Sequence, residues 1–142
     1  MITSAAPLIV VISGIVVLAV TRSLFVASPY VIAAQTMAVA LSVWARRSFP
    51  KGAFRVAAVP GAPSIIRRGP YRFIRHPMYA AALLFIWAAV LSHTSLLNLG
   101  IGLAVTVVVV LRVVVEERLL RKRYPEYGEY ALSTKALIPF IV

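Results

Sequence analysis

The sequence predicts an all-α integral membrane protein with about four transmembrane helices, the last two of which form a helical hairpin. Hydrophobic residues make up 61% of the 142 residues, and the mean hydropathy is +0.92. Soluble domains contain roughly 45–50% apolar residues. Only 13% of the residues are charged. We expect residues 1–142 to form a single membrane domain, because the length suits one domain.

The first two expected spans cover about residues 7–25 and 29–45. No Lys or Arg precedes the first apolar run, and no Ala-x-Ala cleavage site precedes a soluble domain, so we expect a retained helix rather than a signal peptide. Ser28 and Pro29 suit the N-cap and first position of the second helix. Trp44, followed by two arginines, is a plausible anchor for that helix at the membrane surface.

Residues 46–76 differ in kind from the apolar runs. Turn signals rich in Pro and Gly follow one another closely, which predicts a loop rather than a helix. The short apolar stretches 54–59 and 65–66 suit brief extended pieces. A connection of this length points to a functional loop.

The expected third and fourth spans cover about residues 77–91 and 96–115 and form the hairpin. The helical pattern of the fourth span continues beyond its apolar part, and Pro125 is expected to stop it. The tail, residues 116–142, includes an amphipathic, Tyr-rich segment at 126–132 that we expect at the membrane interface.

The basic residues predict the topology. Eight of the fifteen lie between Arg46 and Arg75 and six between Arg112 and Lys135, which leaves only Arg22. With four spans, both clusters fall on the same side as the two termini, and the positive-inside rule makes that side cytoplasmic. Because these basic residues flank apolar spans, their distribution argues against binding of nucleic acid despite the net charge of +11.

The rare residue types exclude several kinds of site. The absence of cysteine excludes disulfides, thiol nucleophiles and Cys-ligated metals. With two histidines and four acidic residues, all of them Glu, we expect no metal site.

A polar cluster is predicted at the start of the third span. Pro77 suits the first helical position, which makes His76 the expected N-cap and leaves backbone N–H groups unpaired. A helix N-terminus beside Arg75 is suited to an anion such as a carboxylate. Tyr79 lies one turn into the helix, and Tyr71 approaches from the loop. The alternative is that the basic residues only anchor the helix in anionic lipid headgroups.

Glu116 and Glu117 are expected at the same depth as this cluster, where the fourth helix leaves the membrane. Glu117 and Arg121, four residues apart, alternatively form an ordinary surface pair. A carboxylate facing an anion site would suit a zwitterionic ligand such as an amino acid moiety.

The stretch GPYRFIRHPMY at 69–79, the pair Glu116-Glu117 with Leu120, and RYPEYGEY at 123–130 together resemble the isoprenylcysteine carboxyl methyltransferase family. They are also similar to the related phospholipid N-methyltransferases. The resemblance covers about residues 60–140. Two positions depart from the family pattern, Ala81 in place of Gly and Tyr124-Pro125 in place of Phe-Gly, and neither removes a charged group.

The resemblance implies S-adenosylmethionine as the cofactor, bound between the last two spans and the C-terminal segment. The residues that match its cofactor motifs are Arg75, His76, Pro77, Tyr79, Glu116 and Glu117, to which we add Tyr71 and Tyr127 as candidate lining residues. Tyr127 alternatively belongs to the aromatic belt.

Three residues are candidates for catalysis. Arg75 or Arg121 would hold a carboxylate acceptor, whereas Glu117 would be the base for an amine acceptor. The acceptor is expected to be lipophilic and to reach the site from the membrane. The small size of the chain favours the cytoplasmic membrane of a bacterium or archaeon, and short helices of this kind also allow a homo-oligomer.

Three other functions fit the sequence less well. A sterol-type reductase would use NADPH, but such chains are much longer. A small exporter generally needs an acidic residue deep in a span, and the first three spans have none. A non-catalytic membrane subunit or lipid-binding protein would not need two glutamates opposite Arg75 and His76.

Overall fold

The structure is a computed structural model that describes residues 6–49 and 64–138. These ranges contain no β-strand, and their helices confirm the all-α prediction. The helices are α1 (Ala6–Val20), α2 (Pro29–Arg47), the 3₁₀ helix η1 (Gly69–Arg72), α3 (Pro77–Ser92), α4 (Leu96–Arg123) and α5 (Tyr127–Ser133).

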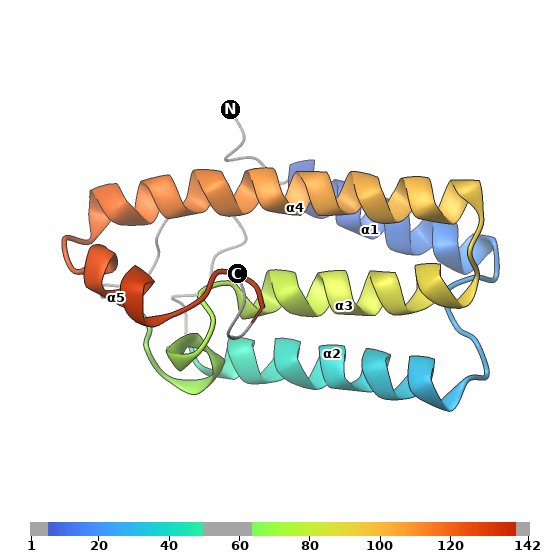
Figure 1. Cartoon of the computed structure of the whole chain (residues 1–142), viewed down its shortest axis with the longest axis horizontal. Helices are drawn as coiled ribbons and strands as arrows, with labels where there is room; N and C mark the ends of the chain where they lie inside the picture. The colour runs from blue at the N-terminus through green and yellow to red at the C-terminus, as the bar shows by residue number, and fades with distance from the viewer. Residues whose placement is uncertain (1–5, 50–63, 139–142) are drawn as a thin grey trace.

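The four long helices lie side by side and alternate in direction (Figure 1). α3 packs between α2 and α4, and α1 packs against α4. The short helices η1 and α5 lie together at the end of the bundle where α2 and α4 finish and α3 begins (Figure 1). This arrangement brings the segments that carry the predicted polar cluster to one end of the bundle.

The expected first span, 7–25, is wrong at its C-terminal end, because α1 stops at Val20. Arg22 adopts the left-handed conformation with a φ of +56°. The Ser23 N–H donates to the Leu18 carbonyl, and the Arg22 N–H to the Ala19 carbonyl. These two bonds form a Schellman motif, which ends the helix.

The other helix ends lie within two residues of the predictions. α2 begins at Pro29 and runs two residues beyond the expected end, to Arg47. α3 begins at Pro77 and ends at Ser92. α4 begins after Ser95, whose Oγ accepts a hydrogen bond from the Asn98 N–H at 3.1 Å, and continues past its apolar part as predicted.

One helix in the described ranges, α4, is long and apolar enough to cross a membrane. Shorter apolar helices cover Leu8–Val20 and Pro77–Ser92. The four-span topology therefore stays a prediction.

The main apolar core lies between α1, α3 and α4. Gly14 allows the close approach of α1, because a Cβ added there would lie 3.1 Å from the Val105 Cγ2 of α4. In α2, the buried Gln35 side chain donates to the Leu24 carbonyl at 2.8 Å, so this polar group is satisfied inside the bundle. The buried core residues are Leu18, Leu24, Ile86, Ala89, Val90, Val105, Val109 and Val113.

The predicted loop 46–76 contains the 3₁₀ helix η1, which the sequence analysis did not anticipate. Gly69 has a φ of +60°, and an added Cβ would overlap the Ser48 Oγ at the end of α2. The neighbouring Arg68 donates through Nε to the Ser48 carbonyl at 2.7 Å, which fastens η1 to α2. The predicted extended piece 54–59 lies outside the described residues, and residues 65–66 adopt no regular secondary structure.

Candidate functional site

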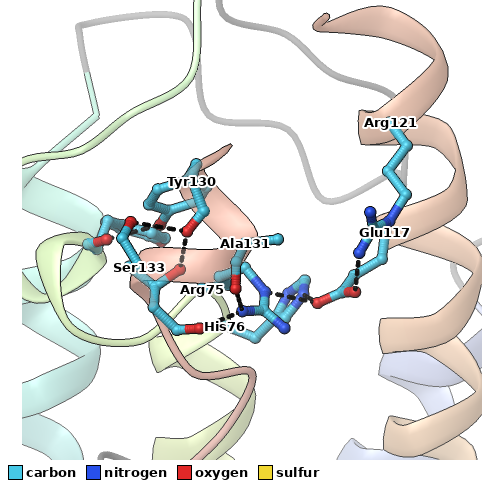
Figure 2. A network of polar contacts seen from close by, with 9 residues as sticks. Arg75, His76, Glu117, Arg121, Tyr130, Ala131 and Ser133 are labelled. Carbon is cyan, nitrogen blue, oxygen red and sulfur yellow. Dashed lines mark hydrogen bonds and ion pairs between the residues drawn. The ribbon is translucent and has the colours of Figure 1, made fainter. Parts of the chain in front are cut away.

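Arg75, just before α3, ties three segments together (Figure 2). Its Nε donates to Oε1 of Glu117 on α4 at 2.7 Å. Its Nη1 donates to the carbonyl of Ala131 in α5 at 3.0 Å and also to the carbonyl of Thr134. The Arg75 side chain is only 12% exposed, so water screens these bonds poorly.

The segment after α5 pairs with the chain leading into α3. Ile74 and Lys135 form a parallel bridge. The Arg75 N–H donates to the Lys135 carbonyl at 2.7 Å, and the His76 N–H donates to the Ala136 carbonyl at 3.0 Å. Backbone pairing and the Arg75 side chain therefore hold the same segment against the site.

His76 occupies the N-cap of α3, as predicted, but its side chain makes no capping hydrogen bond. The imidazole is turned toward α4, where its Nε2 lies 3.4 Å from Oε1 of Glu117. Nε2 is buried and makes no hydrogen bond with any residue that the structure describes. The ring also stacks on Tyr79, with centroids 5.7 Å apart.

Glu117 lies beyond the apolar part of α4 and faces basic side chains. Besides Arg75 and His76, the Nη2 of Arg121 lies 3.9 Å from its Oε2. The contact with His76 and, against the opposing effect of burial, the hydrogen bond from Arg75 lower the pKa of Glu117 to about 2. Glu117 is therefore a carboxylate at neutral pH.

Glu116 faces a different set of groups, because adjacent residues of an α-helix point about 100° apart. The Tyr79 hydroxyl donates to its Oε2 at 2.8 Å. The same hydroxyl accepts a hydrogen bond from the Arg112 Nε at 3.1 Å. Burial, followed by the negative charge of Glu116, raises the pKa of the Tyr71 hydroxyl, so η1 also faces this carboxylate.

Arg112 was not predicted as a functional residue. Only 4% of this residue is exposed, and it lies in the apolar part of α4, inside the expected span 96–115. Two signals were available in the sequence. An arginine inside a span is costly and marks function, and its spacing of four residues from Glu116 puts both on one helical face.

The tyrosines of the tail form a buried cluster, Tyr124, Tyr127 and Tyr130. The Tyr130 hydroxyl donates to the Tyr71 carbonyl at 2.6 Å, which joins α5 to η1. The Arg121 guanidinium lies over the Tyr127 ring, 5.6 Å from its centroid. The Tyr127 hydroxyl is buried and has no hydrogen-bond partner within 6–49 and 64–138. Burial, followed by the charge of Glu117, raises its pKa.

The predicted site residues thus occupy one end of the bundle, in two connected groups. In the first group, Arg75, His76 and Tyr127 lie around the carboxylate of Glu117, with the more exposed Arg121 at its edge. The second group consists of Tyr79, Glu116 and Arg112. The Tyr79 ring stacks on His76, and the Tyr79 hydroxyl makes hydrogen bonds with both Glu116 and Arg112. Pro77 is buried at the start of α3, and Tyr71 lies between η1 and α5.

The fold and this site define a helical, apolar protein whose candidate site lies at one end of the bundle, and part of that site lies on α4, the helix that is long and apolar enough to cross a membrane. The sequence model of the phospholipid methyltransferase family matches residues 25–127, and the chain therefore belongs to that family. The match confirms the resemblance found in the sequence. The reaction of this family is methyl transfer. No curated protein and no solved structure matches the chain.

Proposed function

We propose that the protein transfers a methyl group from S-adenosylmethionine to a lipophilic acceptor at the cytoplasmic face of a membrane. The observation that carries this proposal is the set of polar groups around Glu117. The ionised carboxylate is held by Arg75, while His76 Nε2 and the Tyr127 hydroxyl are buried with no hydrogen-bond partner in the described part of the chain. Buried polar atoms of this kind are rare in folded proteins, so a ligand that binds them is a natural explanation.

These groups fit the methionine end of the cofactor. The Glu117 carboxylate suits its ammonium group, and the basic side chains of Arg75 and His76 suit its carboxylate. When bound, S-adenosylmethionine supplies an electrophilic methyl group on a positively charged sulfur. The residues of the site therefore have to bind, align and exclude water, which is the contribution of proximity to catalysis.

The electrostatics of Glu117 favour a binding role over a catalytic one. A general base works best when its pKa lies near the working pH, whereas the pKa of Glu117 is lowered to about 2. Arg75 donates through Nε and Nη1 to Glu117 and to two backbone carbonyls, and in this proposal its remaining capacity serves the carboxylate of the cofactor. If the acceptor is a carboxylate, Arg121 is the better placed cation, because 55% of its side chain is exposed at the edge of the site.

The outer faces of the helices support membrane embedding. Large apolar side chains are exposed on α1 and α2, and on α4 as well, as at Ile9 (59%), Ile32 (54%) and Val107 (57%). Exposed apolar surface on this scale marks a surface covered by lipid or by another protein. We place four spans in a bacterial or archaeal cytoplasmic membrane, with both termini and the polar site cytoplasmic. The acceptor then enters from the lipid, and the same outer faces allow pairing into a homo-oligomer.

The test is calorimetric binding of S-adenosylhomocysteine to the protein in mild detergent, with NADPH titrated in parallel. We expect affinity on the order of micromolar for S-adenosylhomocysteine. His76→Ala and Glu117→Ala should each weaken it at least about tenfold, whereas Glu129→Gln, an exposed glutamate of α5, should bind as the wild type does.

Binding of NADPH in place of S-adenosylhomocysteine would refute the proposal and favour a reductase. If the folded protein binds neither compound, the polar groups have a structural or lipid-anchoring role. Circular dichroism with thermal unfolding establishes that each variant is folded.

A further inference from the structure

The groups that the proposed cofactor would contact are buried. His76 and Tyr127 are 4% and 1% exposed, and the His76 Nε2 and the Tyr127 hydroxyl are both shielded from solvent. The side chains of Arg75 and Glu117 are 12% and 18% exposed. Because packed side chains leave no room for a ligand to pass, part of the surrounding chain has to move before a cofactor can reach these atoms.

Residues 134–137, which we call the strap, run from the end of α5 to the start of α3 (Figure 1). The Oγ1 of Thr134 donates to the Tyr130 carbonyl at 2.6 Å, so the strap begins attached to α5. Three backbone hydrogen bonds then pair it with the chain before α3. They join the Lys135 N–H to the Phe73 carbonyl at 3.1 Å, the Arg75 N–H to the Lys135 carbonyl at 2.7 Å, and the His76 N–H to the Ala136 carbonyl at 3.0 Å.

The strap is held less firmly than the helices around the site. α3 and α4 share the main apolar core, and α5 is fastened by its buried tyrosines and by the bond from Tyr130 to Tyr71. The strap has its short parallel bridge, and it contributes Leu137, which is partly buried, to the edge of the core. Segments with few buried apolar contacts open at a lower free energy than packed helices. We therefore expect the strap to move first.

Arg75 is shared between the strap and the site. Its Nη1 donates to the Thr134 carbonyl and its backbone N–H to the Lys135 carbonyl, whereas its Nε donates to Glu117. A ligand that binds the guanidinium of Arg75 therefore changes the contacts of the strap. Because such coupling is reciprocal, the position of the strap must change the affinity for the ligand by the same factor.

We propose that the strap is a lid, which opens to admit the cofactor and closes once the cofactor is bound, and that Arg75 couples the two events. This inference rests on the proposed function and goes beyond it, because it concerns how the cofactor enters and leaves. The bound cofactor favours the closed strap, since its charged contacts are stronger where water is excluded. Release of the spent cofactor then waits for the strap to open, as in other enzymes with lids.

Hydrogen exchange of the wild type tests whether the strap opens by itself. After correction for intrinsic rates, the amides that pair the strap, those of Arg75, His76 and Lys135, should exchange at least about 100-fold faster than the amide of Val109 in the core of α4. Saturating S-adenosylhomocysteine should slow these three amides at least about tenfold. Exchange of all four amides at one rate in the free protein, or no slowing of the three by the ligand, would overturn the inference.

A disulfide tests whether the cofactor needs that opening. The chain has no cysteine of its own, and Ile74 and Lys135 form the parallel bridge, so Ile74→Cys/Lys135→Cys supplies one defined pair. Adjacent strands lie about 4.7–4.9 Å apart, within the Cα separation of about 4.4–6.8 Å that a disulfide spans. Oxidised while empty, the variant should bind radiolabelled S-adenosylmethionine at least about tenfold more slowly than when reduced. Oxidised after loading, it should release the label at least about tenfold more slowly. The reduced protein is the matched control for the loss of the buried Ile74 side chain, and its binding of the label shows that the variant is folded.

A substitution in the strap alone should have the opposite effect. Lys135→Pro removes the N–H that donates to the Phe73 carbonyl, and the preceding Thr134, with φ −134° and ψ 160°, has a backbone that proline accepts after it. Loss of this one bond should speed release of the label about fivefold. Lys135→Ala keeps the N–H and removes the same exposed side chain, so it should release the label at the wild-type rate.

The outcomes distinguish this inference from the proposed function. If the folded wild type binds neither S-adenosylmethionine nor S-adenosylhomocysteine, both fail. If it binds them, the proposed cofactor stands, and two results of the kinetic experiments overturn the inference alone. One is equal uptake and release by the reduced and oxidised cysteine variant, with the disulfide verified by mass spectrometry. The other is equal release by Lys135→Pro and Lys135→Ala.

Discussion

The three-way contact of Arg75 gives the sharpest prediction on stability. Arg75 uses two nitrogens to reach the Glu117 carboxylate on one side and the Ala131 and Thr134 carbonyls on the other. In Arg75→Lys the positive charge is kept, but a single ammonium group replaces the planar guanidinium with its several N–H donors. We expect lysine to reach one side only, so that α4 and the segment after α5 are no longer tied to each other through this residue.

The size of the effect follows from these bonds. A hydrogen bond to a charged group contributes about 1.5–3 kcal/mol, and the low exposure of Arg75 and Glu117, 12% and 18%, limits screening by water. With one side retained, we expect a loss of about 2–3 kcal/mol of unfolding free energy. For a chain of this size this corresponds to a Tm lower by roughly 5–12 °C.

Two assays measure this prediction. Thermal unfolding in mild detergent gives the change in Tm, and Arg118→Lys, an exposed arginine of α4, should unfold at the wild-type temperature. Hydrogen exchange reports the local effect at the amides of Arg75, His76 and Lys135, because these amides pair the two segments. Unchanged Tm and unchanged protection at these amides in Arg75→Lys would refute the reasoning that the guanidinium holds the segment after α5 in place.

Three further predictions concern pH, backbone conformation and a buried hydroxyl. Because the pKa of Glu117 is lowered from 4.5 to about 2, its stabilising contribution is present above pH ~4.5 and is lost as the pH falls toward 2. The Tm of the wild type should therefore fall over this window by more than that of Glu117→Gln. Gly69→Ala should cost at least about 1–2 kcal/mol because of the left-handed backbone at this residue, whereas Gly100→Ala, with open space around it, should be neutral or stabilising in thermal unfolding. Tyr130→Phe should cost about 1–3 kcal/mol in the same assay, because a buried carbonyl of η1 loses its hydroxyl donor.

The sequence predicted the helices well where proline fixes their starts. Pro29 and Pro77 restrict φ and lack an N–H, so α2 and α3 begin where the sequence analysis placed them. The end of α1 was missed because its left-handed position, usually Gly, is Arg22. The pairing of Ile74 with Lys135 was missed because it joins distant segments without an alternating strand pattern.

The location of the candidate site could also be predicted, because both arms of an antiparallel hairpin meet at one end. The partners of the two glutamates could not, since adjacent helical residues point about 100° apart and the rotation of α4 against α3 depends on the packed core. Glu117 faces Arg75, and Glu116 faces Tyr79. The role of Arg112 likewise depends on a contact between helices that spacing along the chain does not specify.

We propose that this site transfers a methyl group from S-adenosylmethionine to a lipophilic acceptor. Incubation of the purified protein with methyl-labelled S-adenosylmethionine and bicelles of bacterial polar lipids tests it most directly, by counting label in the lipid fraction. We expect label to accumulate with the wild type and with the exposed-residue control Glu129→Gln, but at a rate at least about tenfold lower with Glu117→Gln. Equal labelling by Glu117→Gln and the wild type, or no label with folded wild-type protein, would contradict the account.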